Sequence, residues 1–310
     1  MTGEFYYEDR EFERARDAFE QAAAERPNDP VVNYWLGKSY AELGQFAQMR
    51  SAWDRSLAHS LRYAEEIEGL LKTYWTQQQV EATSRLEAAE FSGGLTALRN
   101  ALIIQPDDTQ SLQGLAYVYM QVDSVAQAQR VYERLVRDPA NRDAYEALGW
   151  IHMDAGRFEK AVGYLEHLVD IDPFDLDALN HLGLAYEQLE RYPQAVDICE
   201  QLVAMAPDEV PIWLRLGTLY ENVEEPERAG FAYEEALRLE SANVEVVTRL
   251  AQLRVKQGDD EAALPLLELL TVLQAPPAQA VWLQLARIYQ LRGLEQKGRQ
   301  AAQAAQAVEP

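Results

Sequence analysis

Small and apolar residues recur along this chain with a period of 34 positions, most regularly between Tyr145 and Tyr233. Three columns share the period: a Leu-Gly dipeptide, an alanine and a proline. Their members are Leu148-Gly149, Leu182-Gly183 and Leu216-Gly217, then Ala161, Ala195 and Ala229, and then Pro173 and Pro207. A fixed period of this length is typical of repeat proteins. The 310 residues therefore predict one elongated array rather than two globular domains.

The clearest copy of the pattern begins at Trp213. It continues with Leu216-Gly217 and Tyr220, and then with Ala229 and Tyr233. In this spacing, and in the closing proline of other copies, the sequence resembles the tetratricopeptide repeat family, bacterial type. The resemblance implies an all-α fold without strands, namely a right-handed superhelical solenoid of antiparallel helix pairs. Each pair needs its neighbour because it cannot bury its apolar faces alone.

Applied to the whole chain, the pattern predicts a single solenoid over residues 1–310 with about nine units. The expected units are 1–29 (partial), 30–61, 62–108, 109–141, 142–175, 176–209, 210–243, 244–278 and 279–310. Proline with a neighbouring Asp or Asn is expected to end one unit and start the next, as in Pro27-Asn28-Asp29, Pro173-Phe174-Asp175 and Pro207-Asp208. Pro276-Pro277 is expected to force a break after the eighth unit.

The third unit is lengthened, because 45 residues separate Leu61 from Pro106. Eleven additional residues are almost three helical turns, so they extend a helix without rotating its apolar face. Apolar residues at helical spacing predict one long helix over about 62–88 and a turn near Glu90. Many bacterial envelope proteins that resemble this family carry such a helix after their first repeats.

The two terminal units lack covering neighbours. The pattern for unit one lacks most of its first helix, and the sequence ends directly after unit nine. We interpret the chain as a piece of a longer protein, or as one whose gap is filled by another copy. A self-assembling structural scaffold, in which uncapped terminal repeats dock on each other, is therefore an alternative to a partner-binding scaffold.

Charge narrows the range of partners. The formal net charge is −23, which disfavours nucleic acids and anionic membrane surfaces. No apolar run of about 18 residues is present to insert into a membrane, and the first residues lack the apolar core of a signal peptide. Localisation, cytoplasmic or periplasmic, stays open.

Patterns for catalysis and metal binding are missing from the sequence. His59, His152, His167 and His181 do not pair with Cys or with each other at metal-ligand spacing, so we expect no metal site and no cofactor. Cys199 is interpreted as a small buried hydrophobic residue. The enzyme alternative, an α/α-barrel hydrolase, would need longer helices and catalytic acids on loops. We therefore expect no enzyme activity.

The family resemblance implies a groove lined by the first helix of each unit. Its inward-facing positions hold Gln113, Tyr117, Met120, Glu146, Trp150, Met153, Asn180, His181, Leu184 and Glu187. Tyr117, Trp150 and Leu184 share one repeat position and form an apolar stripe. Arg215, Arg249 and Arg287 are interpreted as one basic wall. The expected ligand is a protein or peptide segment that is apolar against units four to six and acidic against units seven to nine.

Some chaperone adaptors of this family bind carboxylates through a clamp that needs Lys and Asn at set positions. Unit two has Tyr34 and Lys38 at those positions, unit four has Gln113 and Tyr117, and unit six has Asn180 and His181. The match fails, so chaperone tails are not expected as ligands.

The acid excess generates a prediction about salt. Self-repulsion at a net charge of −23 weakens the folded state in dilute buffer, and added KCl screens it. The midpoint of thermal unfolding should therefore rise with KCl in circular-dichroism melts. A midpoint that does not change from low to molar salt would contradict the expected effect of charge repulsion on stability.

Overall fold

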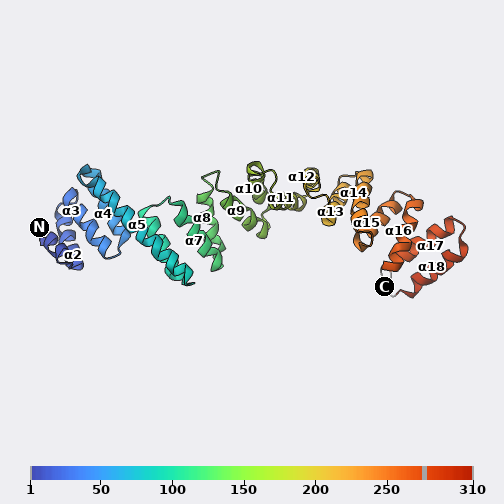
Figure 1. The fold of residues 1–310 in the computed structure, drawn as a ribbon, viewed down its shortest axis with the longest axis horizontal. Helices are drawn as coiled ribbons and strands as arrows, with labels where there is room; N and C mark the ends of the chain where they lie inside the picture. The colour runs from blue at the N-terminus through green and yellow to red at the C-terminus, as the bar shows by residue number, and fades with distance from the viewer. Residues whose placement is uncertain (1, 274–277, 309–310) are drawn as a thin grey trace. The chain divides into compact units, whose positions relative to one another are not determined.

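The computed structural model describes residues 2–273 and 278–308, and these two ranges contain helices and no strand. The all-α fold class is therefore confirmed. Pro276-Pro277, where a break was expected, lies outside the described residues. Figure 1 shows the helices in chain order. Their bounds are α1 (Thr2–Glu8), α2 (Phe12–Glu25), α3 (Pro30–Glu42), α4 (Phe46–His59), a 3-10 helix η1 (Leu61–Tyr63), α5 (Ala64–Glu87), α6 (Phe91–Ile104), α7 (Thr109–Gln121), α8 (Val125–Leu135), α9 (Arg142–Asp154), α10 (Phe158–Ile171), α11 (Leu176–Gln188), α12 (Tyr192–Met205), α13 (Val210–Asn222), α14 (Pro226–Leu239), α15 (Val244–Lys256), α16 (Asp260–Leu273), α17 (Gln279–Leu291) and α18 (Glu295–Ala307).

The chain divides into two compact units, Met1–Leu148 and Gly149–Pro310. We call them the N-terminal unit and the C-terminal unit. The boundary between them falls within α9. Each of the two is described by itself below.

The helices form pairs in which an odd-numbered first helix is joined to an even-numbered second helix by a tight turn. In each such turn one residue has a positive φ. These residues are Gly44, Gly156, Gly258 and Gly293, and also Arg10, Ala89, Asp123, Glu190 and Glu224. Successive members are 34, 45, 34, 33, 34, 34, 34 and 35 residues apart, so the backbone conformation itself carries the repeat.

The turn after α3 shows how these first helices end. The amide of Gln45 donates to the carbonyl of Tyr40 over 2.9 Å, and the amide of Gly44 donates to that of Ala41 over 3.0 Å. These two bonds define a Schellman motif, which satisfies the last carbonyls of a helix when the intervening residue adopts a left-handed conformation. The same pair of bonds recurs at the turn after α13, with Glu225 to Tyr220 and Glu224 to Glu221.

The third pair is lengthened in its first helix, as expected. Helix α5 has 24 residues, whereas α3 and α7 have 13 each. The difference of eleven residues keeps the apolar side of α5 in one direction. Ile67 and Ala82, near the two ends of the helix, are both buried. The first pair is the short one, because α1 spans only seven residues.

The prolines and acidic residues between pairs act differently at different turns. Asp29 caps α3 by accepting from the amides of Val31 and Val32, and Asp175 caps α11 in the same way. The expectation fails for Pro207-Asp208, because the N-cap residue of α13 is Glu209 and its side chain makes no capping bond.

The two helices of a pair cross closely where a small residue follows a leucine. A Cβ atom on Gly37 in α3 would overlap the indole of Trp53 in α4, and one on Gly217 in α13 would overlap the ring of Tyr233 in α14. Both aromatic side chains have an exposed fraction of 0%. Glycine is needed here because it lets a large ring pass directly over the helix backbone.

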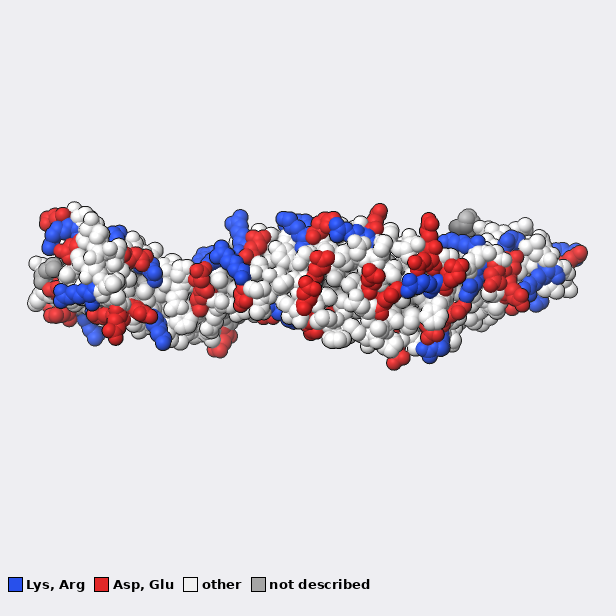
Figure 2. Space-filling view, turned by 90° about the horizontal axis from the view of Figure 1, so that it is seen from above, with Lys and Arg blue, Asp and Glu red and all other residues white. Residues whose placement is uncertain are grey.

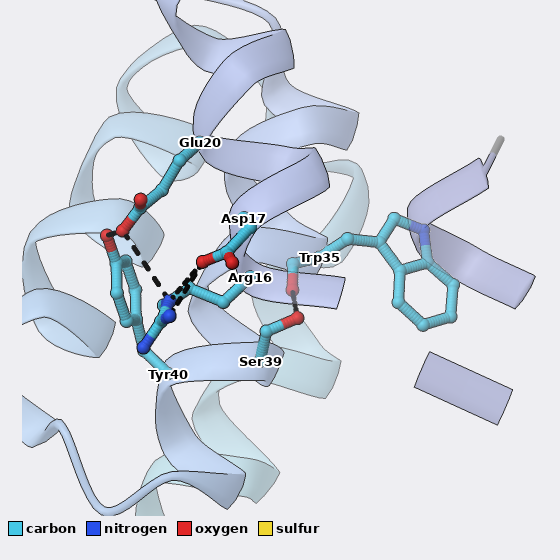
Figure 3. Close-up of polar contacts among 6 residues, drawn as sticks. All are labelled: Arg16, Asp17, Glu20, Trp35, Ser39 and Tyr40. Carbon is cyan, nitrogen blue, oxygen red and sulfur yellow. Dashed lines mark hydrogen bonds and ion pairs between the residues drawn. The ribbon is translucent and has the colours of Figure 1, made fainter. Parts of the chain in front are cut away.

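Consecutive pairs are also joined by a polar contact. Figure 3 shows Tyr40 of α3 beside Glu20 of α2, and its hydroxyl donates to Oε1 over 2.5 Å. Equivalent bonds in the C-terminal unit are Tyr186 to Glu166 (2.6 Å), Tyr220 to Glu200 (2.7 Å) and Tyr289 to Glu268 (2.5 Å). Burial, followed by the bond to Glu20, raises the pKa of Tyr40 to about 12. The hydroxyl therefore stays protonated and can donate at neutral pH.

The close crossing in the C-terminal unit can be tested with a matched pair of glycines. Gly217→Ala should lower the free energy of unfolding by about 1–3 kcal/mol, because the added methyl overlaps the buried Tyr233 ring. Gly163→Ala in α10 is the control, since nothing lies within 4 Å of its Cβ position. The control should be neutral or stabilising by roughly 0.5–1 kcal/mol. Urea unfolding measures both, and equal stability of the two variants would contradict the crossing argument.

Candidate binding surface

The candidate groove residues, thirteen with Glu187 of α11, all lie on first helices. Helix α7 carries Gln113, Tyr117 and Met120, α9 carries Glu146, Trp150 and Met153, α11 carries Asn180, His181 and Leu184, and α13, α15 and α17 carry Arg215, Arg249 and Arg287. We call the solvent-facing side chains of these helices the first-helix surface.

In the N-terminal unit, Tyr117 and Met120 lie three residues apart on α7. Their exposed fractions are 51% and 40%, which is unusual for large apolar side chains. Gln113 on the same helix is also exposed. Glu146 is half-buried and pairs with Arg142 over 3.3 Å. This part of the surface is therefore apolar at Tyr117 and Met120.

In the C-terminal unit, Trp150 and His181 form a contact between α9 and α11. Their ring centroids are 4.0 Å apart and the planes meet at 59°. His181 Nδ1 lies 2.7 Å from the carbonyl oxygen of Asp177. Because a carbonyl only accepts, Nδ1 donates, which fixes the orientation of the imidazole. Trp150 still exposes 51% of its surface, while Met153 and Leu184 are half-buried.

The interpretation of three arginines as one basic wall is corrected by their contacts. Arg215 donates to Glu187 through Nε and to Asn180 Oδ1 over 2.8 Å through Nη1. Only 16% of its side chain is exposed. Arg287 pairs with Asp260 over 2.7 Å. These two cations are largely neutralised by carboxylates of the same chain.

The arginines also differ in repeat position. Arg215 and Arg249 directly precede the leucine of the repeat, whereas Arg287 follows Leu285 by two residues, in the position of Trp150. Arg249 is exposed, and no ion pair joins it to any part of the chain that the structure describes. In Figure 2 blue and red side chains are interspersed on the visible face, with no separate basic patch.

Lys38 occupies the position of Trp150 in the second helix pair. Its Nζ lies 4.7 Å from the centroid of the Trp35 ring, 5.2 Å from Tyr7 and 5.3 Å from Tyr34. Nζ also lies 3.7 Å from Glu66. These cation–π and ionic contacts engage the ammonium within the chain, so Lys38 is a poor donor for an external carboxylate.

Two residues with potentially reactive side chains, His152 and Cys199, are buried. His152 has an exposed fraction of 1% and stacks on Tyr164, with centroids 5.5 Å apart. Cys199 is fully buried and its thiol donates to the carbonyl of Ile212 over 3.6 Å. Burial raises the pKa of Cys199 to about 12, so the thiol stays protonated and unreactive.

Sequence reasoning missed one pocket on the first-helix surface. It has a volume of about 260 Å³ and lies between α15, α16 and α17. We call it the α15–α17 pocket. Gln284 of α17 lines it, and the Oε1 atom of this residue is buried without a hydrogen-bond partner. One signal was available: glutamine stands before Leu285, where Arg215 and Arg249 stand before their leucines.

Two kinds of functional element are absent from the described residues. Among the described residues, no group of three or more His, Cys, Asp and Glu side chains is arranged to hold a metal ion. None of the described helices is both long and apolar enough to cross a membrane.

The fold is similar to those of several solved tetratricopeptide repeat structures. A crystal structure of a tetratricopeptide repeat protein from Parabacteroides merdae is similar at 15% identity, with a TM-score of 0.46, and covers 77% of this chain and 94% of its own. MamA from Desulfovibrio magneticus is similar at 18% identity and a TM-score of 0.44, covering 55% of this chain and 97% of its own. YrrB, described as a tetratricopeptide repeat protein with an unusual peptide-binding site, is similar at 18% identity and a TM-score of 0.46, covering 54% and 87%. The search of curated proteins returns no significant match.

Family models give a direct assignment. A model described as a tetratricopeptide repeat matches residues 2–64, 114–176 and 147–210, which together exceed half of the chain. A second model with the same description matches residues 210–243. With the helix pairs and the repeated turns described above, these matches show that the chain belongs to the tetratricopeptide repeat family.

Proposed function

We propose that this protein is a scaffold that binds a peptide or partner segment through its first-helix surface. Tetratricopeptide repeats are protein-interaction modules and are typically not catalytic, so family membership supports the general role. The location of the binding residues is the more specific part of the proposal. It rests on which side chains the helix pairs leave uncovered.

The observation that carries the proposal is the exposure of Trp150 beside His181. Indole rings are among the strongest contributors to protein interfaces, because they combine a large apolar area with few rotatable bonds. Trp150 keeps 51% of its area exposed, whereas Leu148, Ile151 and His152 of the same helix are buried. Its contact with His181 limits its motion, so little conformational entropy is lost on binding.

In the N-terminal unit, Tyr117 and Met120 supply a second apolar surface. A methionine beside an aromatic ring adapts well to different partners, because its thioether is unbranched and polarisable. Each unit therefore has its own candidate contact. Arg249 is the remaining candidate for an acidic group of the ligand, since Arg215 and Arg287 are paired within the chain.

Binding to Trp150 can be measured once a partner has been captured from the source cells by crosslinking and identified by mass spectrometry. Trp150→Ala should weaken the affinity for the purified partner by about tenfold or more, as expected for a central aromatic contact. Phe174→Ala is the matched control, because Phe174 is a 76% exposed aromatic residue in a turn of the same unit. Fluorescence anisotropy gives the dissociation constants, and circular dichroism checks that both variants fold. Unchanged affinity of Trp150→Ala would show that the partner binds elsewhere.

Arg249→Glu tests the acidic part of the ligand separately. If Arg249 contacts a carboxylate, charge reversal weakens binding and reduces its salt dependence. A variant that binds normally limits the proposal to the apolar contacts.

Self-association is a second candidate function, favoured by one observation in the N-terminal unit. A hollow of about 650 Å³ lies beside α1 and α2 and is lined partly by Tyr6 and Phe19. Phe5 of α1 is 62% exposed. Sedimentation over a hundredfold range of concentration should reveal a dimer that Phe5→Ser weakens. A monomer at all concentrations would eliminate this candidate.

A further inference from the structure

A pocket in the C-terminal unit lies away from the candidate groove residues. It has a volume of about 460 Å³ and lies between the second helices α12 and α14 and the first helix α13. We call it the α12–α14 pocket. None of the candidate groove residues lines it, so its role is separate from theirs.

Phe231 of α14 is the unexpected residue in the lining. Its side chain is 58% exposed. The equivalent positions of the neighbouring pairs hold Gly163, Asp197 and Pro265, which are also exposed. None of these three is a large apolar residue. The packing of a helix pair therefore does not require a large ring at this position, and the exposed phenyl group of Phe231 needs another explanation.

Trp213 of α13 forms an aromatic wall of the pocket together with Phe231. Their ring centroids are 6.1 Å apart and the planes meet at 78°. The indole is held in place because its Nε1 donates to the carbonyl of Pro207 over 2.8 Å. At the equivalent positions, Leu179 and Val247 are both 0% exposed, whereas Trp213 is only half-buried. Both rings thus present apolar area to solvent in the same pocket.

The charged groups of the lining differ in whether they already have partners. Arg228 lies with its guanidinium carbon 4.2 Å from the centroid of the Tyr220 ring, and Glu200 and Glu225 both pair with it. Glu227 is exposed, and no ion pair joins it to any residue that the structure describes. The pocket therefore has an uncompensated carboxylate and no uncompensated cation.

This combination selects the chemistry of an occupant. A neutral apolar group would cover the rings but leave Glu227 without a partner as water is displaced. An anionic group would be repelled by Glu227. A guanidinium group satisfies both parts, because it stacks on aromatic rings and pairs with a carboxylate. Arg228 makes this kind of contact within the chain, with Tyr220 and Glu200.

We propose that the α12–α14 pocket binds an arginine side chain of a partner protein, with its methylene groups against Trp213 and Phe231 and its guanidinium paired with Glu227. This is a second interaction site, on other helices than the contact proposed at Trp150. The inference does not rest on that contact, and the preference of the pocket for a guanidinium can be measured without a captured partner.

The test uses the full chain with labelled methyl groups and two small probes. Butylguanidinium, an analogue of the arginine side chain, should shift the NMR signals of the Val203 and Leu216 methyls, which line the pocket, in a saturable way. N-Butylurea has the same shape without the charge. It should bind about three- to tenfold more weakly, as expected for one exposed ion pair together with a cation–π contact. Added KCl should reduce this difference by screening the ion pair.

Two variants with matched controls assign the effect to the pocket. Glu227→Gln should make the two probes bind equally. Glu261→Gln is its control, because Glu261 has the same repeat position in the first turn of α16 and its loss should leave the preference unchanged. Phe231→Ala should weaken the binding of butylguanidinium by about two- to fivefold, the range of one cation–π contact. Phe174→Ala, at an exposed ring of the same unit, should not.

The inference is overturned if butylguanidinium leaves the Val203 and Leu216 methyls unmoved, or if N-butylurea binds the wild type as tightly at low salt. It is also overturned if Glu227→Gln and Glu261→Gln change the preference equally, because the general acidity of the chain would then account for it. Circular-dichroism melts verify folding. Glu227→Gln, an exposed isosteric change, keeps the test decisive if Phe231→Ala does not fold. Since both probes report on the pocket directly, a failed Trp150→Ala experiment leaves this result unaffected, and the reverse also holds.

Discussion

The fold depends on close packing over the small residue that follows each repeat leucine. At Gly217 the helix backbone approaches the second helix so closely that the Tyr233 ring lies directly on it. No single pair can cover this contact on its outer side, so the next first helix must complete it. The constant repeat length and the left-handed turns place the first helix of the next pair beside this contact.

The same requirement explains why side chains at equivalent positions have such different roles. Where the second helix provides Tyr233, the arginine of the following helix is released and Arg249 is exposed. Where the second helix provides the smaller Cys199, Arg215 lies over Gly183 and forms an ion pair with Glu187. The size of the second-helix side chain therefore determines whether the arginine of the next first helix stays exposed. It explains why counting arginines along the sequence overestimated the basic surface.

The tyrosines have a complementary role between pairs. Tyr40, Tyr186, Tyr220 and Tyr289 each donate to a glutamate on the preceding second helix. At Arg254 the aromatic residue is replaced, yet the side chain still pairs with Glu234. Part of the acid excess is therefore structural, since these glutamates accept bonds that join one pair to the next.

The sequence by itself determined the fold class, because the period of 34 residues and the Leu-Gly columns reflect contacts that any helix pair must make. It also determined the length of α5, since eleven residues are close to whole helical turns. The burial of Cys199 was also predicted from the sequence.

Tertiary structure decided how side chains at those positions are shared between helices. The partners of Arg215 and Arg287, the contact of Trp150 with His181 and the pocket beside Gln284 all join residues of different helix pairs. A repeat pattern specifies which positions face a neighbour. It does not specify whether the neighbour's side chain is long enough to fill the space, because that depends on three helices at once.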